Sequence, residues 1–148
     1  MPTASTGQTS TFYLAAALLV AVIGLRFWRI QRRRGQVLRG EEIASAVNAA
    51  LRNLVAGENR FVVLSVSQRA YLQFASQPNG GMVVEANCPD DNDAAQRVLT
   101  TAGLSPVKGP PNYRATFAST DVGQLVGLAR GYLDALGADS IRIRAGQW

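Results

Sequence analysis

An uncharged apolar run near the start of the chain, followed at once by a cluster of arginines, limits what the chain can form more than any other feature. Residues 12–25 contain no charged side chain, six arginines follow before residue 40, and no Lys or Arg precedes the run. As a helix the run spans about 21 Å, which is shorter than a hydrocarbon core of about 30 Å, whereas residues 12–30 span about 28 Å. We therefore expect a single transmembrane helix over residues 12–30.

Two other structures for this segment stay open, namely a secretory signal peptide and a buried core helix. A signal peptide has a positively charged start and a small-residue cleavage site after its apolar run. Residues 1–11 carry no charged side chain, and arginines rather than an Ala-x-Ala site follow the run. The arginine cluster also disfavours burial in a core. In a spanning helix, Arg26 and Arg29 can extend their long side chains toward the lipid headgroups.

The order of charge predicts how the segment is oriented. Positive residues next to a transmembrane helix stay on the cytoplasmic side. We expect a single-pass protein of the cell's inner (plasma) membrane, with residues 1–11 as a disordered outer stub, residues 31–39 as a basic juxtamembrane linker and residues 40–148 as a cytoplasmic domain. Five arginines are expected to bind anionic lipid headgroups: Arg26, Arg29, Arg32, Arg33 and Arg34.

Charge and composition exclude several functions for residues 40–148. The whole chain has a formal charge of +5, but residues 1–39 contribute +6, and nine basic and ten acidic residues in the remainder give −1. We expect no nucleic-acid partner unless Arg142 and Arg144 act locally. The chain has no His and a single Cys, Cys88, so catalytic triads, Cys–His pairs and an intrachain disulfide are impossible. No metal, no cofactor and no enzymatic activity are expected.

Apolar residues at helical spacing predict three helices in the domain. The first of them begins at about Gly40. We therefore expect a chain that starts at Gly40 to fold without the basic linker. The last helix begins at Thr120 or Asp121 and has the clearest apolar face of the three. The expected helices cover residues 40–56, a segment ending at 102, and a segment from 120 or 121 to 136.

Segments rich in β-branched residues predict an antiparallel sheet between these helices. Three strands form a meander in which Asn79-Gly80, a strong hairpin dipeptide, joins the second strand to the third. Three prolines in residues 105–112 predict an irregular loop. The expected strands cover residues 60–67, 71–75, 82–87 and 113–118, and residues 141–144 form a last edge strand or a tail. The fold class is therefore α+β, with a meander and one or two further strands packed against two or three helices.

The order of these elements resembles the YbjN-like and type III secretion chaperone-like superfamily, in particular its actinobacterial TY-chaperone domains. The resemblance covers roughly residues 42–137. The chain departs from the family in two respects. Leu104 stands where an aromatic residue often follows the helix-ending glycine, and this chain has an expected membrane anchor whereas many members of the family are soluble. The motifs that carry the resemblance are YLQF at 71–74, GMVVEAN at 81–87, AGLSP at 102–106 with Leu99 before it, and NY at 112–113.

This resemblance implies a chaperone-like module that binds a protein or peptide client, as a homodimer. Gln73 and Glu85 interrupt apolar strands and are expected on an exposed side of the sheet, with Val62, Leu64 and Val66 or their alternate neighbours in the core. The register across Asn79-Gly80 decides whether Gln73 and Glu85 share a face, and the sequence leaves this open. Two other interpretations stay open: a structural or regulatory subunit of a membrane complex, and a tethered small-molecule-binding or enzymatic domain. The expected partner-binding residues are Tyr71, Gln73, Phe74, Glu85 and Tyr113.

Overall fold

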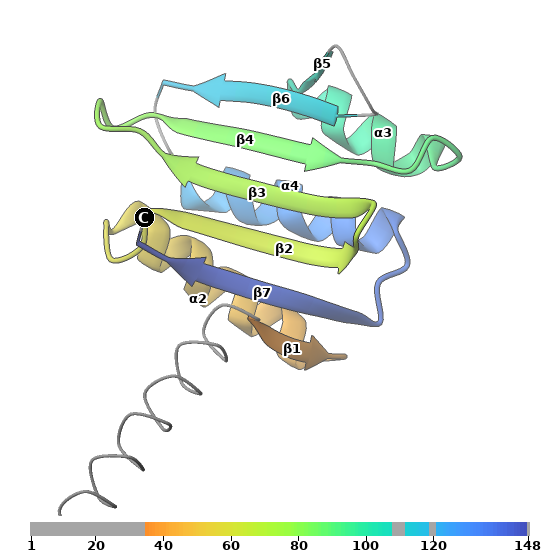
Figure 1. Ribbon diagram of the computed structural model, residues 1–148, viewed down its shortest axis with the longest axis horizontal. Helices are drawn as coiled ribbons and strands as arrows, with labels where there is room; N and C mark the ends of the chain where they lie inside the picture. Colours follow the sequence, from red (N-terminus) through yellow and green to blue (C-terminus); the bar gives the residue numbers. More distant parts are fainter. Residues whose placement is uncertain (1–34, 108–111, 119–120, 148) are drawn as a thin grey trace, which may run out of the picture. The chain divides into compact units, whose positions relative to one another are not determined.

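A seven-stranded antiparallel sheet with three helices on one face forms the part of the chain that the computed structural model describes, namely residues 35–107, 112–118 and 121–147 (Figure 1). The chain divides into two units, and this sheet belongs to the second, which begins at Gly35. The expected transmembrane helix and the five arginines that were expected to bind lipid lie outside the described residues. No helix within them is long and apolar enough to cross a membrane.

The meander predicted from the sequence is confirmed. Its strands are β2 (Phe61–Ser67), β3 (Ala70–Ser76) and β4 (Met82–Asn87). Gly80 adopts a φ of +82°, which glycine tolerates best, and the Asn79 side chain accepts a hydrogen bond of 3.0 Å from the Gly81 N–H. This turn sets a register in which Gln73 lies directly opposite Glu85. The two residues therefore share a face of the sheet.

The sheet is wider than the sequence predicted, with the order β1-β7-β2-β3-β4-β6-β5. The expectation of a loop from 105 to 112 is partly wrong, because a short strand begins at Ser105. Its residue Pro106 is tolerated because β5 is an edge strand, where a missing N–H costs no internal ladder bond. The additional and adjusted strands are β1 (Gln36–Arg39), β5 (Ser105–Val107), β6 (Asn112–Phe117) and β7 (Ser140–Gly146).

The last strand is neither an edge nor a tail, because β7 lies between β1 and β2. Its neighbour β1 falls inside the range that was expected to be a linker. Leu38 of β1 pairs with Ile141 and is only 5% exposed, so it belongs to the core. A chain beginning at Gly40 would lose this strand and leave β7 at the edge. The expectation that Gly40 marks the start of the folded domain is therefore corrected to Gly35.

The three helices are α2 (Glu42–Val55), α3 (Asp93–Thr101) and α4 (Val122–Ala135). Side chains cap two of them: Asn92 accepts from the Ala95 N–H at 2.9 Å, and Asp121 accepts from the Gly123 N–H at 2.9 Å. The amide of Asn92 also donates to the Ala135 carbonyl at 3.2 Å, which ties the start of α3 to the end of α4.

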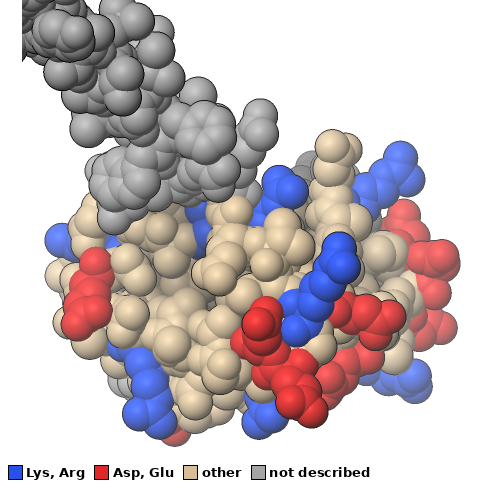
Figure 2. Space-filling model, turned by 90° about the horizontal axis from the view of Figure 1, so that it is seen from below, with Lys and Arg blue, Asp and Glu red and all other residues tan. Residues whose placement is uncertain are grey.

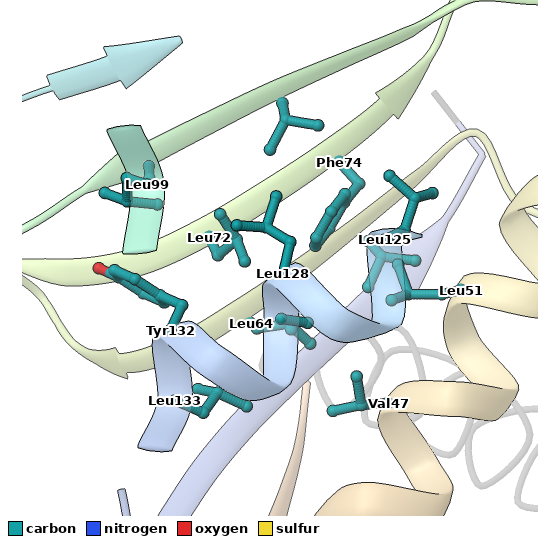
Figure 3. Packing of buried hydrophobic residues seen from close by; sticks show 14 of the residues in the cluster. Val47, Leu51, Leu64, Leu72, Phe74, Leu99, Leu125, Leu128, Tyr132 and Leu133 are labelled. Atoms are coloured by element: carbon teal, nitrogen blue, oxygen red, sulfur yellow. The ribbon is translucent and has the colours of Figure 1, made fainter. Parts of the chain in front are cut away.

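The core fills the space between the sheet and the helices, and α4 crosses its middle (Figure 3). Leu128 and Tyr132 of α4 are both buried, although the sequence did not place them on its apolar face. The predicted face consisted of Val122, Leu125, Val126, Ala129, Leu133 and Leu136. Tyr132 fits because its hydroxyl donates to the Asn87 carbonyl at 2.5 Å, so its polar end is satisfied. The labelled side chains come from β2 and β3 (Leu64, Leu72, Phe74), from α2 and α3 (Val47, Leu51, Leu99) and from α4 (Leu125, Leu128, Tyr132, Leu133).

Candidate functional site: the open face of the sheet

None of the three described helices covers the second face of the sheet, which is turned toward the viewer in Figure 1. Strand residues alternate between the two faces, so each buried residue has neighbours that point the other way. Leu72 and Val84 are fully buried, whereas Gln73 and Glu85 next to them are partly exposed. We call this second side the open face. Its central residues are Val63, Ser65, Tyr71, Gln73, Ala75, Val83, Glu85, Asn87 and Arg114.

A row of polar side chains crosses the middle of the open face. Gln73 lies opposite Glu85, and Glu85 lies opposite Arg114 of β6. The Arg114 Nε and the Glu85 Oε1 are 3.5 Å apart, and their side chains are 54% and 40% exposed. Such an exposed pair contributes little to stability, about 0–1 kcal/mol. The row is therefore available for contacts with another molecule at small cost to the fold.

A small pocket of about 110 Å³ lies beside this row, where β3, β4, β6 and β5 come together. Its polar lining includes Tyr71, Glu85, Asn112 and Arg114. Among the described residues, the Asn112 Oδ1 is buried and accepts no hydrogen bond. A buried acceptor without a donor is unfavourable by roughly 1–3 kcal/mol.

The structure separates the predicted site residues into two groups. Tyr71, Gln73 and Glu85 lie together on the open face, which the sequence left open because it did not fix the register across the turn. Phe74 and Tyr113 do not, because they point toward the helices and are 0% and 8% exposed. Their place in the site was wrong for a simple geometric reason. Phe74 is one residue from Gln73, and one step along a strand reverses the side chain.

Sequence reasoning missed two residues of the open face, Arg114 and Asn112. A signal for both was present in the sequence. Tyr113 is apolar in a strand that was correctly expected, so the residues on either side of it had to point away from the core. What the sequence could not supply was the pairing of β4 with β6, which brings Arg114 next to Glu85.

The buried groups with titratable hydrogens are poor candidates for chemistry. Burial, followed by the charges of Asp90 and Asp91, raises the pKa of the Cys88 thiol. Burial also raises the pKa of Tyr132, well above the usual range for a tyrosine, with smaller effects from Cys88 and Tyr71. Both groups therefore keep their protons near neutral pH, whereas a reactive cysteine needs a lowered pKa. Their role is in packing and hydrogen bonding.

No metal centre or cofactor cradle stands out in the described part of the chain. Among those residues, no three His, Cys, Asp or Glu side chains lie close enough together to hold a metal ion. Two open grooves separate the helices, one of about 400 Å³ between α3 and α4 and one of about 410 Å³ between α2 and α4. The first has an apolar floor, which includes Val98, Leu125 and Leu128, and Arg97 also lines it.

Charged side chains of both signs occur on the surface shown in Figure 2, which views the domain from the β1 side. Acidic groups gather toward one end of this surface, and basic groups lie between and beside them. No single sign therefore dominates this view.

Comparisons with known proteins identified no relative of this chain. No protein-family model, no curated protein and no solved structure matches the chain. The assignment of a function therefore depends on the open face itself and on the resemblance in the motifs of β3 and β4.

Proposed function

We propose that this protein is a membrane-anchored, cytoplasm-facing binding module that holds a protein or peptide client on the open face of its sheet, without enzymatic activity. The observation that carries the proposal is the open face. It has partly exposed apolar and aromatic side chains around the row of Gln73, Glu85 and Arg114, and no described helix covers it. Surfaces of mixed polarity with a few aromatic residues are typical of transient protein interfaces.

The chemistry of the open face suits an extended segment of polypeptide. Tyr71 offers a ring and a hydroxyl, Glu85 accepts hydrogen bonds, and Arg114 donates them. A pocket of about 110 Å³ has room for a small side chain or for water, but not for a large cofactor.

Affinity capture from detergent extract tests this proposal when the wild-type chain is compared with two variants. Glu85→Ala combined with Gln73→Ala changes the open face, and Gln124→Ala combined with Thr101→Ala changes exposed residues of the α3–α4 groove as a matched control. We expect one stoichiometric partner with the wild type and the control, and weaker capture with the open-face variant. Equal capture by all three chains contradicts the proposal.

The identity of the captured protein separates the two leading interpretations. A soluble, secreted or envelope client favours the chaperone-like role that the resemblance implies. Recovery of integral membrane subunits alone favours a structural or regulatory subunit of a membrane complex.

The expected location has a test of its own. The absence of Lys and Arg before residue 12 and the six arginines after residue 25 predict an outer N-terminus and a cytoplasmic domain. A C-terminal reporter that is active only after export should stay silent. Strong reporter activity outside the cytoplasm contradicts the expected orientation.

A further inference from the structure

We propose that the β1–β7 side of the open face lies on the anionic surface of the membrane, with Val37, Arg39, Arg142 and Arg144 as its contact residues. This inference rests on the proposed anchoring of the chain. It assigns a second surface of the domain, which differs from the client surface around Gln73 and Glu85.

The pairing of β1 with β7 brings these residues together. Val37 lies opposite Arg142, and Arg39 lies opposite Ser140. Leu38 and Ile141 alternate with them and point into the core, so the arginines and Val37 point to the open side. Val37 is 54% exposed, more than Val107 (45%) and Val55 (37%), the other exposed large hydrophobic residues of the described part of the chain. An exposed apolar side chain between arginines suits the boundary between lipid headgroups and water.

None of the arginines on this surface forms an ion pair within the described residues. The ion pair of Arg114 with Glu85 is the single ion pair among them, and it lies on the opposite half of the sheet. Arg144 packs over the Phe61 ring, with 5.7 Å between its guanidinium carbon and the ring centre, and this contact leaves the positive charge in place. The strands β1 and β7 contain no acidic residue, and Glu41, Glu42 and Asp139 lie beyond their ends.

The linker between the proposed anchor and the domain is short. Five residues, 31–35, separate the end of the expected transmembrane helix from the start of β1. Fully extended, they span only about 20 Å. Three of them are Arg32, Arg33 and Arg34, which are themselves expected to bind headgroups. The strand that carries Val37 and Arg39 therefore begins where anionic lipid is concentrated, and complementary charge favours contact.

The two surfaces occupy different parts of the open face. Glu85 lies on β4 and Arg114 on β6, which are three and four strands away from β7. At about 4.8 Å between neighbouring strands, these residues lie about 14 and 19 Å from β7 across the sheet. Contact of β1 and β7 with lipid therefore does not use the residues of the client surface.

Depth-dependent quenching on the full chain tests this inference. The chain is reconstituted in nanodiscs of phosphatidylcholine, or of equal parts phosphatidylcholine and phosphatidylglycerol, with a trace of spin-labelled headgroup lipid. A fluorophore is attached at Ser140→Cys on β7, or at Ala94→Cys on α3 as the control position; both native residues are exposed. The native Cys88 is buried, so labelling is confined to the introduced thiol.

We expect stronger quenching at position 140 than at position 94, and only in the anionic nanodiscs. Replacing Arg142 and Arg144 by Gln should lower the ratio of docked to undocked domain by roughly 25-fold, at about fivefold per arginine. The matched pair Arg97→Gln and Arg130→Gln, which removes the same charge from exposed positions of α3 and α4, should leave it unchanged. Salt at 1 M should also abolish the difference, because the Debye length falls to about 3 Å.

Equal quenching at the two positions, or equal effects of the two arginine pairs, overturns this inference and leaves the anchoring intact. A chain that does not enter nanodiscs at all overturns the proposed anchoring and this inference with it. A change of oligomeric state in the Arg142 and Arg144 variant, without a change in quenching, overturns the lipid assignment in favour of a second copy of the chain.

Discussion

The two faces of the central sheet are made of the same strands and differ in almost every other respect. On the helix side, Leu64, Leu72 and Val84 are fully buried. On the open side, Val63, Gln73 and Glu85, each one residue away, are partly exposed. The buried face therefore fixes the structure, and the open face is the one that we propose for binding. Substitutions on the helix side should therefore lower the free energy of unfolding, and substitutions on the open side should weaken partner binding.

The largest difference is expected between two adjacent residues of β3. Phe74→Ala empties a site that is fully buried and should lower the free energy of unfolding by roughly 3–5 kcal/mol. Gln73→Ala removes a partly exposed side chain and should lower it by no more than about 0.5 kcal/mol. Urea denaturation of both variants measures the difference. Similar losses in the two variants would show that the open face is part of the core.

A similar but smaller contrast is expected in β1, the strand that the sequence placed in a linker. Leu38→Ala should lower the free energy of unfolding by roughly 2–3 kcal/mol, because Leu38 is 5% exposed between β7 and α2. Val37→Ala, at the exposed neighbour, serves as the control and should change it by less than about 0.5 kcal/mol. If Leu38→Ala were as stable as the wild type, β1 would not belong to the folded domain.

The buried hydroxyl of Tyr132 should produce a moderate effect that depends on pH. Tyr132→Phe loses the hydrogen bond to the Asn87 carbonyl and should cost about 1 kcal/mol at neutral pH. The pKa of Tyr132 is raised in the folded state, so the unfolded chain loses this proton first, near pH 10. The stability of the wild type should therefore fall as the pH rises above about 10.

The Phe variant is the control for that pH dependence, because it has no hydroxyl at this position to titrate. Denaturation midpoints between neutral pH and pH 11 should converge for the two chains as the pH rises. Parallel curves would show that the Tyr132 hydroxyl ionises as readily in the folded chain as in the unfolded one.

The smallest effect on stability is expected at Glu85. Glu85→Ala breaks an exposed ion pair with Arg114 and should change the free energy of unfolding by no more than about 0.5 kcal/mol. Arg114→Ala should have an equally small effect, because the pair is the same. A loss of several kcal/mol in either variant would mean that this row supports the fold and is not reserved for a partner.

The sequence predicted the meander and the helices because each has a clear period of its own. Val62, Leu64, Leu72 and Phe74 alternate as a half-buried strand must, and Asn79-Gly80 sets the register that brings Gln73 and Glu85 together. The edges of the sheet were harder. A strand as short as β1 has one buried residue, Leu38, and therefore no period that could distinguish it from a linker.

The candidate site, too, could be predicted only in part from the sequence. Gln73 and Glu85 were predicted because they are polar residues in apolar strands, but the inclusion of Phe74 and Tyr113 ignored the alternation of side chains along a strand. The ion pair of Glu85 with Arg114 and the unsatisfied acceptor of Asn112 depend on the pairing of β4 with β6. Those strands are separated by a helix and a loop in the chain. Pairing between such distant segments is set by the tertiary fold and leaves no local pattern to read.

Site-specific photo-crosslinking in living cells tests the central claim most directly, because it reports contacts of the anchored full chain. A photoreactive residue is placed at Gln73 on the open face, or at Thr100 on the exposed side of α3 as the control. We predict a discrete adduct, either with a client or with a second copy of the chain, from position 73 and none from position 100. No adduct from position 73, or the same adducts from both positions, would contradict the assignment of the open face as the working surface.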